Sequence, residues 1–206
     1  MKNKLSDDIF EQLKNDIVFN RLRAGEKIGE LELCRRYNVS RTPVRQALQR
    51  LENLGLVEIR DGVGTFVTVI AEKDVSYAYE IRCMAEKLAA EKAIYRIKES
   101  ELAEQKQRFL NIQTQLERGG YGSSFEDMIV ADWKLHDLIM NNSGNPLLGL
   151  SVEKVTLLLR RCQFAYISQY ETATREHLEI IDCLINKNLE ALFAVLDRHL
   201  KFRPNG

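Results

Sequence analysis

The hydrophobic pattern changes its period near residue 55, and this change constrains the fold of the first third of the chain. Apolar residues follow the 3.6-residue period of helices in three successive segments, at about 5–20, 30–37 and 40–54. Gly55 is a favourable residue for ending a helix. After it come two strand-like segments, 56–60 and 65–69, joined by a hairpin turn at 61–64. Helices followed directly by a β-hairpin predict a winged helix-turn-helix.

The charge distribution supports a nucleic-acid-binding surface in the same region. The whole chain has no net charge, which taken alone argues against such a protein. Between residues 33 and 50, however, there is no acidic residue and there are five arginines, namely Arg35, Arg36, Arg41, Arg45 and Arg50. The sequence therefore predicts a compact basic surface on a neutral protein.

The N-terminal end of the third helix is expected to enter the major groove of DNA, with Ser40 as its N-cap residue. Arginine can form paired hydrogen bonds with guanine, whereas hydroxyls and helix N-terminal amides suit phosphates. Glycines in the wing allow its backbone to approach DNA closely. The candidate DNA-binding residues at these positions are Ser40, Arg41, Thr42, Arg45, Gly62 and Gly64.

A family resemblance agrees with this prediction. Residues 40–51 (SRTPVRQALQRL), 55–57 (GLV) and 62–67 (GVGTFV) resemble the DNA-binding domain of GntR-family regulators, and the likeness extends over residues 5–69. The resemblance implies DNA contacts at Arg41, Thr42 and Arg45, with a wing glycine near the minor groove. Many members carry an arginine early in the second helix, where this chain has Leu31. Arg35 or Arg36 could supply a phosphate contact instead.

The remainder of the chain is expected to be entirely helical. Residues 71–74 are the predicted linker, and the clearest breaks lie at 119–122 and 143–146. Six helices are predicted, at about 74–97, 99–118, 124–142, 146–168, 171–187 and 189–202. The fold class is therefore mainly α, with a winged helix-turn-helix domain at 1–70 and an all-helical bundle at 71–206.

All three histidines lie in this helical part, each on an apolar helix face. Asp132 and His136 are four residues apart and share one face, while His177 and His199 belong to two later helices. A divalent metal ion would satisfy one aspartate and three neutral imidazoles together. The alternative is that each histidine is a hydrogen-bonded core residue and that Asp132 simply pairs with His136.

An arginine also lies on an apolar stripe, in the first helix of the bundle. The planar guanidinium of Arg82 suits a carboxylate ligand, and Glu86, one turn further on, could pair with it in the absence of ligand. Alternatively, the two residues form only a structural salt bridge. Four aromatic residues could line a ligand pocket or serve as core or dimer contacts: Trp133, Phe164, Tyr166 and Tyr170.

A second resemblance covers the helical part. Residues 79–90 (YEIRCMAEKLAA) look like the opening helix of the FCD domain, the effector domain of FadR-type GntR regulators. The Asp132–His136 pair and residues 143–148 (SGNPLL), 176–181 (EHLEII) and 198–200 (RHL) are similar to its later motifs. In metal-binding members the matching aspartate and three histidines hold the ion, and the matching arginine helps to anchor a carboxylate effector. Six helices resemble the VanR-like subgroup.

Together these features predict a homodimeric transcription regulator that reads a palindromic operator and acts as a repressor released by a small carboxylate. The resemblance implies a metal at Asp132, His136, His177 and His199 and an effector at Arg82 and Glu86. Zinc is favoured, with nickel, manganese and iron as alternatives. A protein of the cytoplasm is expected, because the sequence shows no membrane-spanning stretch and no signal peptide. Two rival hypotheses are a metal sensor and a metalloenzyme, although no general base is evident for the latter.

Overall fold

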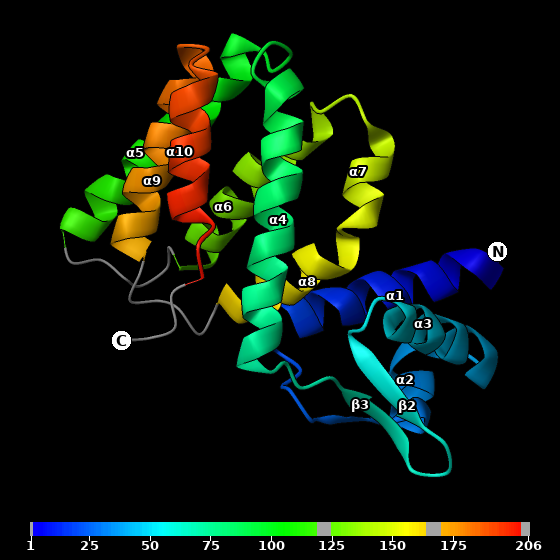
Figure 1. Cartoon of the computed structure of the whole chain (residues 1–206). Helices are drawn as coiled ribbons and strands as arrows, with labels where there is room; N and C mark the ends of the chain where they lie inside the picture. The colour runs from blue at the N-terminus through cyan, green and yellow to red at the C-terminus, as the bar shows by residue number, and fades with distance from the viewer. Residues whose placement is uncertain (1, 119–124, 164–169, 203–206) are drawn as a thin grey trace. The chain divides into compact units, whose positions relative to one another are not determined.

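The computed structural model describes residues 2–118, 125–163 and 170–202, and the chain forms two compact units (Figure 1). The first unit comprises residues 1–75 with 156–164, and the second comprises 76–155 with 165–206. The predicted break at 119–122 lies outside the described residues. None of the described helices is long and apolar enough to cross a membrane.

The first unit has the predicted winged helix-turn-helix. Its helices are α1 (Lys2–Val18), α2 (Glu30–Tyr37) and α3 (Arg41–Asn53), and its strands are β1 (Lys27–Ile28), β2 (Val57–Arg60) and β3 (Gly64–Val67). The strands form an antiparallel sheet in the order β1-β3-β2. The prediction missed β1, because two residues are too short to show an alternating pattern.

Two helices supply most of the core of this unit. Residues spaced four apart on α1, Ile9, Leu13 and Ile17, are almost completely buried, as are Leu48 and Leu51 of α3. Burying one such aliphatic side chain stabilises the fold by about 1.5–3 kcal/mol. The packing of α1 on α3 therefore fixes the orientation of the exposed face of α3.

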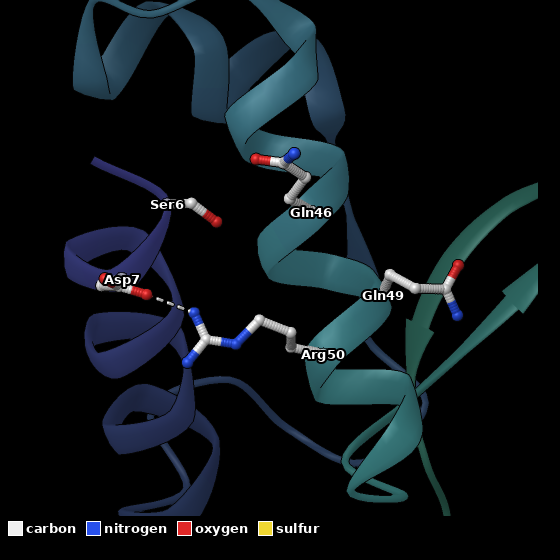
Figure 2. Close-up of a pocket in the computed structure, with 5 residues that line it drawn as sticks. All are labelled: Ser6, Asp7, Gln46, Gln49 and Arg50. Carbon is white, nitrogen blue, oxygen red and sulfur yellow. Dashed lines mark hydrogen bonds and ion pairs between the residues drawn. The ribbon is translucent and has the colours of Figure 1, made fainter. Parts of the chain in front are cut away.

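Arg50, one of the five clustered arginines, is also used in this packing. Its guanidinium lies 3.9 Å from the ring centroid of Phe10 and donates a 2.6 Å hydrogen bond to the carboxylate of Asp7 on α1 (Figure 2). The pair is solvent-exposed, so its contribution to stability is about 0–1 kcal/mol. Arg50 accordingly braces α1 against α3.

The helices of the remaining chain differ from the prediction at two places. They are α4 (Glu72–Ala93), α5 (Glu99–Glu117), α6 (Phe125–Asn141), α7 (Pro146–Ser151), α8 (Glu153–Cys162), α9 (Tyr170–Ile185) and α10 (Leu189–His199). The predicted linker at 71–74 is wrong, because α4 already begins at Glu72 and the irregular connection is 68–71. The unit division falls within α4, after Val75, and within α8, after Val155.

The single helix predicted at 146–168 is also wrong, since α7 and α8 are separated at Val152. Gly149 disfavours a helix, because glycine loses more conformational entropy than other residues when its backbone becomes ordered. In addition, the hydroxyl of Ser151 donates a 2.8 Å hydrogen bond to the carbonyl of Leu147. Both effects weaken a continuous helix. The described part of 71–206 therefore has seven helices instead of the six predicted, and residues 164–168 lie outside it.

The core of the second unit lies among five of its helices. Ala89, Ala90 and Ala93 of α4 are completely buried in the same cluster as side chains of α5, α6, α9 and α10. Figure 1 shows α5, α9 and α10 side by side, and these helices are in contact. Alanine removes side-chain bulk from α4, so its backbone can lie close to its neighbours. This packing brings polar residues on the inner helix faces together.

The core assignment predicts that Leu51→Ala lowers the free energy of unfolding by about 2–5 kcal/mol, because it leaves a cavity between α1 and α3. Leu31→Ala is the matched control, since Leu31 is 54% exposed, and a change within about 0.5 kcal/mol is expected there. Urea unfolding of both variants followed by circular dichroism measures the difference. Equal stabilities would contradict this description of the core.

Candidate functional site: a histidine and aspartate cluster

Three helices of the second unit bring one aspartate and three histidines together. Asp132 and His136 lie on α6, His177 lies on α9, and His199 is the last residue of α10. One ligand atom from each of the four residues lies within 4.8 Å of every other. The four residues selected from the sequence are thus brought to one place in the bundle.

Three distances within this cluster match the edges of a metal coordination polyhedron, while Oδ2 of Asp132 lies 3.9 Å from Nε2 of His136. Nε2 of His136 is 3.3 Å from Nε2 of His177 and 3.2 Å from Nε2 of His199. Oδ2 of Asp132 is 3.1 Å from Nε2 of His177. Ligands about 2.1 Å from a shared ion are separated by roughly 3.0–3.4 Å in octahedral or tetrahedral geometry. The donor set therefore fits a divalent ion.

Two buried glutamates hold two of the imidazoles from behind. Oε2 of Glu86 lies 2.5 Å from Nδ1 of His136, and Oε2 of Glu176 lies 3.0 Å from Nδ1 of His199. An ionised carboxylate only accepts hydrogen bonds, so Nδ1 carries the proton in both rings. The lone pair of each Nε2 then points into the cluster, which is the arrangement that a metal ligand requires.

The sequence analysis missed the role of Glu176. The sequence offered one signal, because Glu176 lies four residues before Ile180 and so shares a helix face with it. The structure shows that Ile180 is fully buried and that Glu176 is only 6% exposed. It therefore belongs to the apolar stripe of α9, where an unpaired carboxylate would be costly. Glu176 also accepts a hydrogen bond from Nε of Arg198 at 3.3 Å.

The electrostatics of the cluster favour neutral imidazoles beside an ionised carboxylate. Burial lowers the pKa of His136, His177 and His199 below the ordinary value of histidine. Burial acts to raise the pKa of Asp132, but the neighbouring histidines and Arg82 hold it well below its usual range. Uncharged nitrogen lone pairs and one carboxylate face the same point, so a cation there would be stabilised.

The predicted pair of Arg82 and Glu86 is present at the edge of this cluster. Nε of Arg82 donates a 2.6 Å hydrogen bond to Oε1 of Glu86, and Nη2 lies 3.9 Å from Oδ1 of Asp132. Burial opposes ionisation of Glu86, yet His136 and Arg82 lower its pKa to about 2. Glu86 thus joins the guanidinium of Arg82 to the imidazole of His136.

The aromatic residues proposed as pocket lining are only partly described. Phe164 and Tyr166 lie outside the described residues. Burial raises the pKa of Tyr170, and the charge of Asp132 adds to this shift, which indicates that Tyr170 lies close to the cluster. The sequence analysis did not select Phe109, whose ring stacks on His177 with a centroid separation of 4.6 Å.

The candidate DNA-binding residues lie on the exposed face of the first unit. Ser40, Arg41, Thr42 and Arg45 are exposed at the start of α3, and Arg35 is exposed on α2. Ser40 is the N-cap residue of α3, as predicted, and has the extended backbone of that position, although its side chain makes no capping hydrogen bond. The turn that precedes α3 begins at Asn38, the C-cap residue of α2, which adopts a left-handed backbone conformation.

A groove beside α3 joins the predicted base-reading arginine to the wing. Arg45, Gly62 and Gly64 line this groove together with Glu30. Nε of Arg45 donates a 3.0 Å hydrogen bond to the carboxylate of Glu30, a pairing that the sequence analysis did not anticipate. Gly64 has φ +135°, a backbone conformation that other residues rarely adopt, so the backbone favours glycine there.

A winged helix-turn-helix with an exposed arginine-rich helix, together with a helical bundle, is the architecture of a DNA-binding transcription regulator. Comparison with known families agrees. Residues 5–67 match the family of bacterial regulatory proteins named gntR, and residues 77–202 match the FCD domain. The chain belongs to the GntR family of regulators and carries an FCD domain.

Known relatives support this assignment over most of the chain. An uncharacterized HTH-type transcriptional regulator of Bacillus subtilis, YdhC, is 32% identical over 88% of this chain and 81% of its own length. The HTH-type transcriptional repressor RspR of Escherichia coli is 28% identical over 96% of this chain and 86% of its own. A GntR regulator structure from Rhodococcus sp. RHA1 shares the fold with a TM-score of 0.76 at 22% identity, covering 95% and 93% of the two chains.

The hydrogen bonds behind the histidines predict their tautomers. In metal-depleted protein near pH 8, His136 and His199 are expected to carry their proton on Nδ1, as long-range ¹H–¹⁵N spectra of ¹⁵N-histidine-labelled protein would show. Glu176→Leu should let the Nε2–H form of His199 appear. Glu179→Leu is the control, because Glu179 contacts Arg198 from the same helix but makes no described contact with His199. An Nε2–H tautomer of His199 in the unsubstituted protein would contradict the geometry.

Proposed function

We propose that this GntR regulator is a repressor whose hold on its operator is released by a small carboxylate bound in the second unit. The chain is a DNA-binding transcription regulator and not an enzyme, as its family and its relatives show. The observation that carries the proposal is the convergence of three Nε2 atoms and one Asp132 oxygen within 4.8 Å. The description of its relative RspR as a repressor supports the direction of regulation.

The cluster would hold a divalent metal ion through Asp132, His136, His177 and His199. Zinc suits three imidazoles and a carboxylate, while nickel, manganese and iron remain alternatives that availability can favour. An ion with an open coordination position would supply a Lewis-acid site for a carboxylate oxygen. The residues themselves provide neutral, oriented nitrogens and exclude most water, since His136 and His177 are nearly fully buried.

Arg82 and Glu86 would recognise the effector. The guanidinium of Arg82 already lies beside Asp132 and is held by Glu86, so an incoming carboxylate would enter an existing charge network. The effector carboxylate would accept a further hydrogen bond from the guanidinium of Arg82, or it would replace Glu86 as the acceptor. Arg82 is on α4, and the side chains proposed to bind the metal are on α6, α9 and α10. One carboxylate effector would therefore be connected to four helices. Regulation requires that the ligand prefers one packing of these helices.

The first unit would read DNA through the start of α3. Arg41, Thr42 and Arg45 are the proposed base contacts, with Ser40 and Arg35 on phosphates and Gly62 or Gly64 near the minor groove. Arg45 would exchange Glu30 for a guanine edge, at small cost because the ion pair is exposed.

The functional domains are proposed to be 1–70 and 71–206, and two copies would bind a palindromic operator. The irregular connection at 68–71 supports this boundary. A two-fold symmetric protein matches a palindromic operator, in which two half-sites face opposite directions. The expected place of action is the cytoplasm, where the DNA of a bacterium lies.

Arg45→Ala is expected to lower affinity for a selected operator by about 10–100-fold, since one bidentate arginine–guanine pair supplies about 1–3 kcal/mol of discrimination. Affinity for unrelated DNA should fall much less. Fluorescence anisotropy on a duplex selected from random sequences with the unsubstituted protein measures both. Arg108→Ala, which removes a charge from α5 where Arg108 pairs with Glu104, is the control. If Arg45→Ala still distinguishes the selected operator from unrelated DNA, Arg45 does not contact a base.

Operator binding measured with metal-depleted protein, with added zinc, and with zinc plus a panel of dicarboxylates and sugar acids tests the regulatory proposal. We expect a carboxylate to weaken operator binding only when zinc is present. His177→Ala should lose both the bound zinc and the response, because it removes one of four ligands. Arg82→Lys should retain zinc but bind the carboxylate at least tenfold more weakly, since lysine keeps the charge without the fork.

The outcomes distinguish the rival hypothesis. If zinc alone switches operator affinity and no carboxylate adds to it, the protein is a metal sensor. Stoichiometric zinc in His177→Ala would exclude His177 from the ligand set. Unchanged carboxylate affinity in Arg82→Lys would exclude bidentate anchoring by Arg82.

A further inference from the structure

The proposed base contacts at Arg41, Thr42 and Arg45 leave two exposed glutamines of α3 unused. These are Gln46 and Gln49, which help to line a pocket between α1 and α3 (Figure 2). Counted from Arg41, Gln46 is the sixth residue of the helix. At a rise of about 1.5 Å per residue, Gln46 lies ~7.5 Å along the axis from Arg41. It therefore belongs to the part of α3 that would enter the major groove.

The direction in which Gln46 points follows from the burial of α3. The inner side of this helix is defined by its four buried residues, Val44, Ala47, Leu48 and Leu51. Because each helical residue is rotated by about 100° from the one before, Gln46 points within about 30° of directly outward. On the same basis, Arg45 and Arg50 point about 70° to either side of the outward direction. Gln46 is thus at least as well directed at the floor of the groove as Arg45.

The amide of Gln46 is available to a ligand, whereas that of Gln49 is occupied. Nε2 of Gln49 donates a 2.7 Å hydrogen bond to Oε2 of Glu52, and Oε1 of Glu52 accepts a 2.9 Å bond from the backbone N–H of Ile59 on β2. Figure 2 shows Gln49 extending towards the strands and Gln46 pointing away from them. No hydrogen bond joins Gln46 to another residue in the part of the chain that the structure describes.

The charges of the pocket favour the edge of a base over a phosphate. Asp7 lines the pocket beside Gln46, and the guanidinium of Arg50 is already bound to its carboxylate at 2.6 Å. A phosphate would therefore meet a negative charge there, whereas a base edge is neutral. Adenine presents an acceptor, N7, beside a donor, the N6 amino group, and a glutamine amide pairs with both at once.

We propose that Gln46 reads an adenine in each half-site of the operator. Nε2 of Gln46 donates to N7, and Oε1 accepts from the N6 amino group. The adenine lies within about two base pairs of the guanine that Arg45 would read, because the two residues are adjacent on α3. The inference rests on the proposed entry of α3 into the major groove, and it adds a residue that determines specificity.

Selection of duplexes from a random library with the full chain tests which base is read. The unsubstituted protein is expected to prefer adenine at one position of each half-site, and Gln46→Ala to lose about tenfold of that preference while keeping the others. Gln46→Glu should change the preferred base there to cytosine, because a carboxylate accepts from the N4 amino group. Gln49→Ala is the matched control, since it removes the other amide of the pocket and should leave every preference unchanged. Circular dichroism verifies that each variant is folded.

An atomic change in the DNA tests the contact itself. At the selected position, 7-deazaadenine replaces N7 by carbon and so removes the acceptor. In fluorescence anisotropy the unsubstituted protein is expected to bind this duplex several-fold more weakly than the adenine duplex. Gln46→Ala should bind the two duplexes equally, because it has no donor to lose. The same loss in both proteins would refute a contact between Gln46 and N7.

The outcomes separate this inference from the proposed function. If the full chain enriches no sequence, neither operator reading nor the inference stands. If Arg45→Ala loses discrimination while Gln46→Ala keeps every preference, α3 reads the operator without Gln46. A uniform loss of affinity for all sequences in Gln46→Ala, with unchanged preferences, would assign Gln46 to a phosphate and refute the adenine contact.

Discussion

The convergence of three imidazole nitrogens on one buried point is the constraint on which the second unit depends. Nε2 of His136 lies 3.3 Å from Nε2 of His177 and 3.2 Å from Nε2 of His199, an arrangement that is unfavourable unless a cation or a proton lies between these nitrogens. The protein maintains it with carboxylates behind the rings. Glu86 joins α4 to α6 through His136, and Glu176 joins α9 to α10 through His199. The polar cluster therefore sets how four helices are held together.

This constraint gives α4 two faces with different surroundings. One face carries Arg82 and Glu86 into the cluster and is otherwise packed through alanines, so small movements of the helix are felt directly by the site. The other face carries exposed apolar side chains, among them Tyr77, Met84 and Leu88. Lys87 at its flank is tied to Asp197 of α10 at 2.8 Å. A helix held by ion pairs and small residues can shift without opening a large cavity, whereas tightly interdigitated bulky side chains would resist such a shift.

The sequence predicted those features that repeat regularly along the chain. The winged helix-turn-helix followed from the hydrophobic period. The convergence of Asp132, His136, His177 and His199 was indicated by their apolar helix faces together with the resemblance to the FCD domain. Features that depend on one local balance were missed. The break at Val152 arises from weak helix preference at Gly149 and a single hydroxyl bond from Ser151, which no periodicity reveals. Long-range hydrogen bonds, such as the one between Glu176 and His199, require the tertiary fold before they can be seen.

The same reasoning explains how a neutral chain can carry a DNA-reading surface. Arg36, Arg45 and Arg50 each lie beside an acidic residue of the first unit, namely Asp16, Glu30 and Asp7. Such pairs reduce the attraction of the surface for phosphate in general, and they are weak enough to be exchanged when a guanine edge offers two acceptors to an arginine. If Arg45 reads a base as proposed, these pairs would weaken non-specific binding more than specific binding and so widen the ratio between the two affinities. Under the proposed function, a carboxylate that changes the spacing of two such surfaces would then release the operator.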